Sequence, residues 1–95
     1  MARGRLTLDA ARFEAAWDGA PVALTVTEFA ILRALATAPG RVLTRDALMD
    51  IAYPDRRVVS DRTMDSHIRH IRQKFAALGA DPIGTVHGLG YRFAG

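Results

Sequence analysis

The chain has 95 residues, a length that suits one small domain. Hydrophobic residues make up 49% and charged residues 24%, and the absence of cysteine excludes a disulfide framework and a cysteine-based zinc site. No apolar run approaches the ~20 residues of a membrane span and no signal peptide is evident, so we expect a cytoplasmic protein.

The positive charge is concentrated in the second half of the chain. Residues 1–50 contain six arginines and six acidic residues, whereas residues 51–95 contain six arginines and one lysine against four aspartates. The net charge of +3 therefore belongs to residues 51–95. Such an excess indicates an anionic partner, with nucleic acid first, although a solvated basic surface would give the same count.

Residues 1–26 are predicted to form a small antiparallel sheet. Leu6 and Leu8 alternate with polar neighbours, and Asp18-Gly19 is a hairpin signal. The expected strands are residues 3–9, 12–17 and 21–25.

Three helices are predicted over residues 27–78, of which the first two end before Pro54. Thr27 is the expected N-cap of the first, which Pro39-Gly40 ends, and Thr44 is the expected N-cap of the second. The apolar residues expected to be buried are Phe29, Ile31, Leu32 and Leu35 in the first helix and Ala47, Leu48 and Ile51 in the second. The short joint between them is compatible with helix-turn-helix, and equally with any small helical bundle.

The third helix is predicted from Ser60 or Asp61 to about Leu78, with an apolar and a polar face. At about 100° per residue, the core stripe comprises Met64, Ile68, Ile71, Phe75 and Leu78. The opposite face comprises Arg62, Ser66, Arg69 and Gln73. Arginine can neutralise phosphate or read guanine, and serine and glutamine can bond to base edges, so this face suits a major groove. An ordinary solvent face is also polar, and the helix alone leaves both interpretations open.

Residues 83–95 are predicted to form a C-terminal β-hairpin. Residues 84–94 alternate apolar and polar around His87-Gly88. A hairpin that follows a third helix is a wing. The predicted fold is therefore of the α+β class: a winged helix-turn-helix over residues 1–95, with an N-terminal antiparallel sheet, three helices and a wing hairpin.

Three stretches of the chain resemble the effector domain of OmpR/PhoB-type response regulators. They read TVTEFAILRALATAPGRVLTRDALMDIAY, DRTMDSHIRHIRQKF and IGTVHGLGYRF, and the resemblance spans essentially the whole chain. It implies a four-stranded N-terminal sheet and transcription regulation in a bacterial two-component system. The third helix would enter the major groove of double-stranded DNA and the wing the adjacent minor groove. Two copies would bind direct-repeat half-sites head to tail.

The resemblance also implies partners other than DNA. The family places a phosphoacceptor receiver domain ahead of this one, which implies that the chain belongs to a longer protein; a free-standing effector is the alternative. Residues 53–60 correspond to a loop that meets RNA polymerase in some members. Here Ala52-Tyr53 replaces the Trp-Gly common at its start, which puts the polymerase contact in doubt.

DNA contacts follow from the resemblance position by position. The base-facing positions are Thr63, Asp65, Ser66 and His70. The phosphate-facing positions are Arg62, His67, Arg69, Arg72, Thr85 and Tyr91, and His87 is the wing-tip residue at the minor groove. Many relatives have arginine at positions 70 and 87. Neutral histidine offers one donor and one acceptor instead of a charged fork, so the family's base-reading rules do not transfer there.

The residues themselves also suggest other roles. A structural hydrogen bond is expected of His67, at the edge of the core stripe, and hairpin packing of Tyr91. His67 and His70 have the spacing to share a metal, but no cysteine completes such a site, so neither a metal nor another cofactor is expected. No catalytic constellation or phosphate-binding loop is evident, so we expect no enzyme. The competing function is a winged helix that binds protein without reading DNA, which the basic outer face of the third helix disfavours.

Overall fold

The N-terminal sheet comes first along the chain. The computed structural model describes residues 1–54 and 61–94, without the side chains of residues 61 and 62. Its strands β1 (Ala2–Arg3), β2 (Leu6–Asp9), β3 (Glu14–Trp17) and β4 (Ala20–Val22) pair antiparallel in that order. The single strand expected over residues 3–9 is two strands, because the chain turns at Gly4, where φ is +57°. The four-stranded sheet that the resemblance implied is therefore confirmed.

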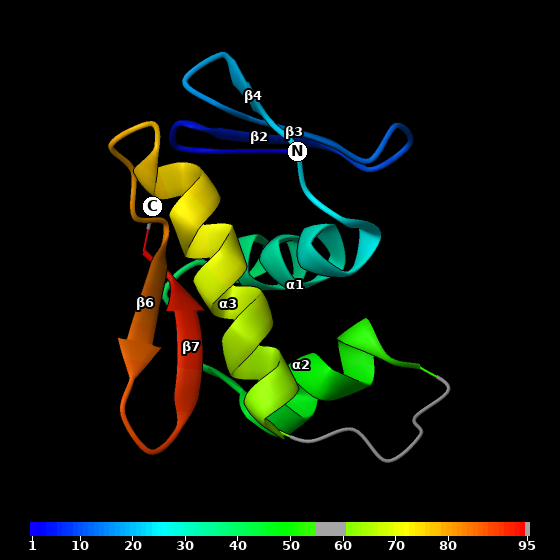
Figure 1. Cartoon of the computed structure of the whole chain (residues 1–95), viewed down its shortest axis with the longest axis vertical. Coiled ribbons are helices and arrows are strands. Elements are labelled where there is room, and N and C mark those ends of the chain that lie inside the picture. Colours follow the sequence, from blue (N-terminus) through cyan, green and yellow to red (C-terminus); the bar gives the residue numbers. More distant parts are fainter. Residues whose placement is uncertain (55–60, 95) are drawn as a thin grey trace.

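Three helices and a second sheet complete the domain (Figure 1). The helices are α1 (Val26–Thr37), α2 (Arg45–Ala52) and α3 (Asp61–Ala76). The strands are β5 (Leu43–Thr44), β6 (Ile83–Val86) and β7 (Gly90–Phe93), in the order β5-β7-β6. The wing hairpin β6–β7 lies beside α3, and its turn lies at the end of the molecule away from the N-terminal sheet. Within the described residues, no helix has the length and apolar character that crossing a bilayer requires.

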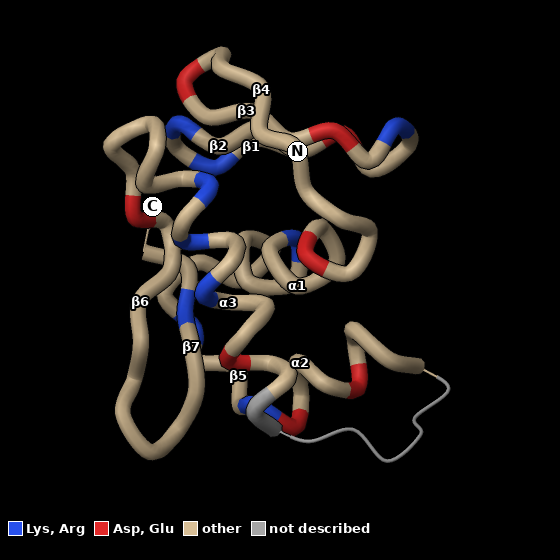
Figure 2. Tube along the Cα trace, viewed as in Figure 1, with Lys and Arg blue, Asp and Glu red and all other residues tan. Residues whose placement is uncertain are grey.

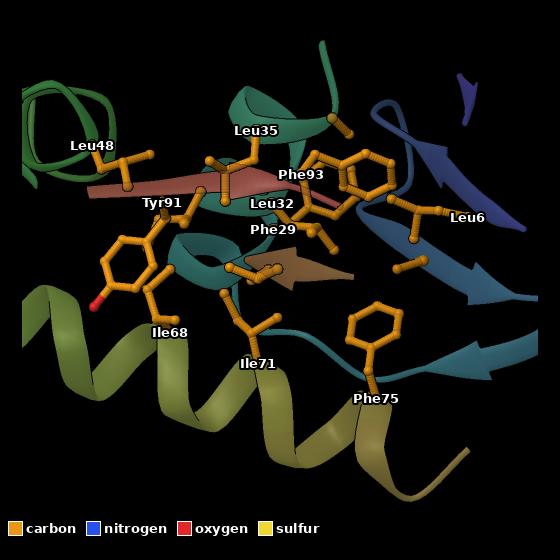
Figure 3. Close-up of a cluster of buried hydrophobic side chains, with 14 of the residues drawn as sticks. Leu6, Phe29, Leu32, Leu35, Leu48, Ile68, Ile71, Phe75, Tyr91 and Phe93 are labelled. Atoms are coloured by element: carbon orange, nitrogen blue, oxygen red, sulfur yellow. The ribbon is translucent and has the colours of Figure 1, made fainter. Parts of the chain in front are cut away.

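The hydrophobic core lies between α1, α3, the wing and the inner face of the N-terminal sheet (Figure 3). The predicted α3 stripe is confirmed for four residues, each at most 1% exposed: Met64, Ile68, Ile71 and Phe75. Leu78 was wrongly included: it is 42% exposed, because α3 ends at Ala76 and Leu78 lies in the turn that follows. In α2 the inward residues are Leu48 and Met49, whereas Ile51, predicted to be buried, is 40% exposed.

Helix α1 begins two residues earlier than the sequence prediction placed it. Its N-cap is Thr25, not Thr27: the Glu28 amide donates to Thr25 Oγ1 at 3.1 Å, and the Thr25 amide donates to Glu28 Oε1 at 2.9 Å. This reciprocal pair is a capping box, which satisfies donors that the first helical turn leaves open. The cap predicted for α2 is confirmed, since Thr44 Oγ1 accepts from the Ala47 amide at 3.1 Å.

The two threonines give a direct test of the cap. We expect Thr25→Ala to lower the free energy of unfolding by about 1 kcal/mol, because a side-chain acceptor at the N-cap is lost. The matched variant Thr27→Ala should change it by no more than about 0.5 kcal/mol, since Thr27 lies inside the helix. Urea unfolding of both variants measures the difference, and equal losses would contradict the assignment of the cap to Thr25.

The joint between α1 and α2 contains a strand that the sequence prediction missed. Strand β5 pairs antiparallel with β7, with Leu43 opposite Tyr91 and Thr44 opposite Gly90. Backbone hydrogen bonds therefore join the segment between α1 and α2 to the wing in one sheet. Gly90 makes this pairing possible, because a Cβ at this position would lie 2.1 Å from the carbonyl oxygen of Leu43.

Candidate nucleic-acid interface

The outer face of α3 is polar and lies beside the wing. Arg69 and His70 lie three and four residues after Ser66, and Gln73 lies four and three residues after them, which places all four on one side of the helix. Arg69, His70 and Gln73 are exposed and Ser66 is half-buried. Thr63, one turn before Ser66, is also half-buried. Figure 2 shows Lys and Arg along α3 and in β7, so the positive charge that the structure describes in the second half of the chain lies in these two elements.

The wing supplies a second exposed feature. Its turn, between β6 and β7, carries His87 and Leu89, both exposed, and Gly88 there has a φ of +77°. Leu89 is 59% exposed, the highest value for a large apolar side chain in the wing. His87 is therefore free to meet a partner placed against α3 and the hairpin turn.

Asp65, predicted to face bases, is bonded inside the protein. Its Oδ1 accepts from Arg45 Nε of α2 at 2.9 Å and from the Tyr91 hydroxyl of β7 at 2.5 Å. The hydrogen bond from Tyr91 lowers the pKa of Asp65, and the Arg45 guanidinium lowers it further. The same contacts with Asp65 raise the pKa of Arg45. Three elements of the fold thus meet at one carboxylate oxygen.

Tyr91, predicted to lie near a phosphate, is only 5% exposed. Its ring lies 5.9 Å from the guanidinium carbons of both Arg45 and Arg72, within the range of a cation–π contact. Figure 3 shows the ring beside Ile68, with its hydroxyl directed away from the apolar cluster. Burial, and then the bond to Asp65, raise the pKa of Tyr91. The hydroxyl therefore stays protonated and donates a hydrogen bond to the carboxylate.

Arg72 and Thr85, two further phosphate candidates, bond to each other. Arg72 donates through one terminal nitrogen to Thr85 Oγ1 at 2.8 Å and to the carbonyl oxygen of Ile83 at 2.7 Å. Its Nε lies 3.8 Å from a carboxylate oxygen of Asp81. The guanidinium therefore connects α3 to β6, and its positive charge remains at the edge of the interface.

His67 is held by a tyrosine at the end of α2. Its Nε2 and the hydroxyl oxygen of Tyr53 are 2.6 Å apart, which satisfies the expectation of a structural hydrogen bond. Burial lowers the pKa of His67, so the ring is neutral at physiological pH. Residues 55–60, most of the loop compared with the polymerase-binding segment, and the side chain of Arg62 lie outside the described residues.

Sequence reasoning missed two residues of this region, Arg45 and Tyr53. Arg45 directly follows the α2 N-cap and bonds to a residue 20 positions away, and Tyr53 bonds to one 14 positions away. A helical wheel of α3 carries no information on such partners. The only available signal was the replacement of the usual Trp-Gly by Ala52-Tyr53, which marked position 53 as unusual.

A helix-turn-helix whose last helix lies beside a β-hairpin defines a winged helix-turn-helix domain, the predicted fold. Residues 19–93 match the family described as transcriptional regulatory protein, C terminal. The chain belongs to this family.

Known relatives agree with this assignment. The chain is 44% identical over 94 residues to the transcriptional regulatory protein BaeR of Escherichia coli, which covers 97% of this chain and 39% of that protein. It is similar to the DNA-binding domain of the response regulator AdeR in complex with an intercistronic region, with a TM-score of 0.90, 26% identity, and coverage of 98% and 97%.

It is also similar to the response regulator DrrB, an OmpR/PhoB homolog of Thermotoga maritima, with a TM-score of 0.84, 33% identity, and coverage of 100% and 44%. The resemblance to OmpR/PhoB-type effector domains is thus confirmed, and the chain spans about two fifths of the length of BaeR.

Proposed function

We propose that this domain binds double-stranded DNA in a sequence-specific manner and regulates transcription as the output domain of a two-component response regulator. The observation that carries the proposal is the exposed polar face of α3 beside the hairpin turn, in a chain of this family. A helix of this kind fits the major groove, and the wing turn reaches the adjacent minor groove. The AdeR domain, which has the same fold, is in complex with an intercistronic region.

The proposed contacts divide the predicted residues into two groups. The residues proposed to contact DNA have exposed or half-buried side chains and no side-chain bond to the described part of the chain: Thr63, Ser66 and His70 at bases, Arg69 at a phosphate and His87 in the minor groove. Residues with internal partners support the contacting groups: Asp65, His67, Arg72, Thr85 and Tyr91. Arg62 is kept as a phosphate contact from its position in the sequence alone.

The wider assembly is part of the same proposal. Two copies bind direct-repeat half-sites, and a receiver domain in the full-length protein controls them. A regulator of bacterial genes works in the cytoplasm, where the chromosome lies. Contact of residues 53–60 with RNA polymerase rests on the resemblance alone.

Selection of bound sites from random duplexes tests the proposal. We expect enrichment of a repeated motif, with base preference in a central tract read by α3 and a flanking tract read by the wing. A pool that stays random after repeated rounds, while the protein remains folded, would refute DNA reading and favour a protein-binding winged helix.

Arg69 distinguishes phosphate contact from base reading. We expect Arg69→Ala to weaken binding to all duplexes alike and to lower the slope of log affinity against log salt by about one unit. Arg33→Ala is the matched control, since it removes an exposed arginine from α1 and should leave the slope unchanged. Ser66→Ala should instead alter the preference at one or two base positions by about 1–3 kcal/mol. A changed motif with an unchanged salt slope in Arg69→Ala would overturn the assignment of the α3 face.

A further inference from the structure

Helix α3 and the wing are connected by two groups of hydrogen-bonded side chains, here called clasps. The first is formed by Arg45, Asp65 and Tyr91, from α2, α3 and β7, where Asp65 Oδ1 accepts from both partners. The second is formed by Arg72 of α3 with Thr85 and the Ile83 carbonyl of β6. The Tyr91 ring contacts a guanidinium of each clasp. The two clasps therefore hold both strands of the wing against α3.

The first clasp combines a buried tyrosine with an ion pair whose side chains, Arg45 and Asp65, are 41% and 43% exposed. Its bonds join a carboxylate to an arginine and to a hydroxyl donor, and hydrogen bonds to charged groups are the stronger ones in proteins. Tyr91 is 5% exposed, so little solvent reaches its ring to compete for the contacts. A buried tyrosine that already donates its only hydroxyl proton has none to give to a phosphate.

We propose that Tyr91, together with Arg45, is a positioning residue of the DNA interface, which through Asp65 fixes the orientation of the wing relative to α3. The proposal rests on the proposed function, because it concerns how two DNA-reading elements are held. The consequence is that α3 and the wing read DNA at one fixed spacing. Arg45 and Tyr91 thus affect which base pairs are read together, although neither contacts a base.

The test separates the wing's contribution to binding from that of α3. The parent and Tyr91→Phe are titrated with two duplexes: the complete selected half-site, and the same half-site shortened by its wing-side flank. The ratio of the two affinities measures what the wing adds. Tyr91→Phe keeps the ring between the guanidinium groups and removes only the bond to Asp65. We expect the ratio to fall about tenfold, with affinity for the shortened duplex within about twofold of the parent.

Two further variants show that the effect passes through the wing. Tyr53→Phe is the matched control, since it also removes a tyrosine hydroxyl bonded to an α3 side chain, but one that does not reach the wing. In Tyr53→Phe the ratio of the affinities for the complete and the shortened duplex should equal that of the parent, even if both affinities fall by the same factor. His87→Ala removes the wing-tip side chain. If Tyr91 acts through the wing, the affinity losses of His87→Ala and Tyr91→Phe should not be additive. The double variant should then bind the complete duplex as tightly as the single variant that binds it less tightly.

A readout without DNA keeps the two proposals distinguishable. Hydrogen exchange of the wing amides in the free protein should be faster in Tyr91→Phe than in the parent, and unchanged in Tyr53→Phe. If the parent binds no duplex, the proposed function fails, and faster exchange still reports the clasp. If the parent binds and Tyr91→Phe weakens both duplexes equally, or leaves the ratio and the exchange unchanged, the positioning role is overturned.

Discussion

Gly90→Ala is expected to lower the free energy of unfolding by about 3 kcal/mol or more. The added Cβ would lie 2.1 Å from the Leu43 carbonyl oxygen and 2.9 Å from the Thr44 Cα. Both are backbone atoms of β5, so no side chain can rotate away, and β5 and β7 must separate to admit the methyl group. Urea unfolding followed by tryptophan fluorescence measures the loss.

Gly88→Ala is the control for this substitution. Gly88 also has a positive φ, +77°, but a Cβ there would meet nothing within 4 Å. Its expected cost is the backbone strain of a non-glycine residue alone, about 1 kcal/mol. A loss in Gly90→Ala no larger than that in Gly88→Ala would show that β5 and β7 do not approach as described.

The second large effect is expected at the ion pair between α1 and α3. Glu28 is 4% exposed, and its Oε1 lies 2.5 Å from Lys74 Nζ. Lys74→Met keeps most of the aliphatic stem but leaves a buried carboxylate without its cation. We expect the free energy of unfolding to fall by about 2–3 kcal/mol at neutral pH, which is at or below the lower limit of the range for a fully buried pair, because the Lys74 side chain is 35% exposed.

The loss should shrink as the pH falls. Burial raises the pKa of Glu28, but the bonds from Lys74 and Thr25 outweigh it and leave the pKa below its usual value. In the parent, this carboxylate therefore stabilises the fold above the unfolded-state pKa, and the contribution is lost as pH falls through the lower folded-state pKa. Without Lys74, burial dominates and Glu28 takes up a proton at higher pH, which removes the unpaired charge.

Parent and Lys74→Met should consequently converge in stability only as the pH falls below the lowered folded-state pKa of Glu28 in the parent. Glu28→Gln combined with Lys74→Met should be more stable than Lys74→Met alone at neutral pH, since a neutral amide can keep the capping box without a buried charge. A double variant as unstable as the single one, or a loss that grows in acid, would contradict this account of the pair.

Local patterns in the sequence predicted most elements of the fold. The α3 stripe from Met64 to Phe75 has the 3.6-residue period of a helix, and the Asp18-Gly19 hairpin adopts φ values of +53° and +84°, as such a turn requires. The N-cap of α1 could have been predicted correctly from the local sequence. Thr25 is followed by glutamate at the third position, which is the capping-box signal, and Thr27 is not.

Two errors arose because the deciding contacts are not local. Strand β5 has two residues, too few to show alternation, and its partner lies 46 or more positions away. Ile51 and Leu78 fit the helical period, but each lies at or beyond the end of its helix, where the core no longer covers it.

The interface follows the same division between local and distant contacts. The outer face of α3 could be predicted from the helical period alone, and Arg69 and His70 are exposed on it. The hydrogen-bond partners of Asp65 and Tyr91 could not, because the helical period shows which face a residue occupies and not which distant residue it contacts. Those partners come from α2 and β7, at separations of 20 and 26 residues.

The position of β7 has a consequence for synthesis of the protein. This strand comes after the other described elements in the chain, yet it is the central strand of its sheet, and it supplies Tyr91 and Phe93 to the core. A nascent chain that has released α1 and α3 from the ribosome, but not residues 90–93, lacks the side chains of Tyr91 and Phe93 in its core and the tyrosine partner of Asp65. The core is therefore completed only when β7 emerges, and until then the apolar side chains that Tyr91 and Phe93 cover stay exposed.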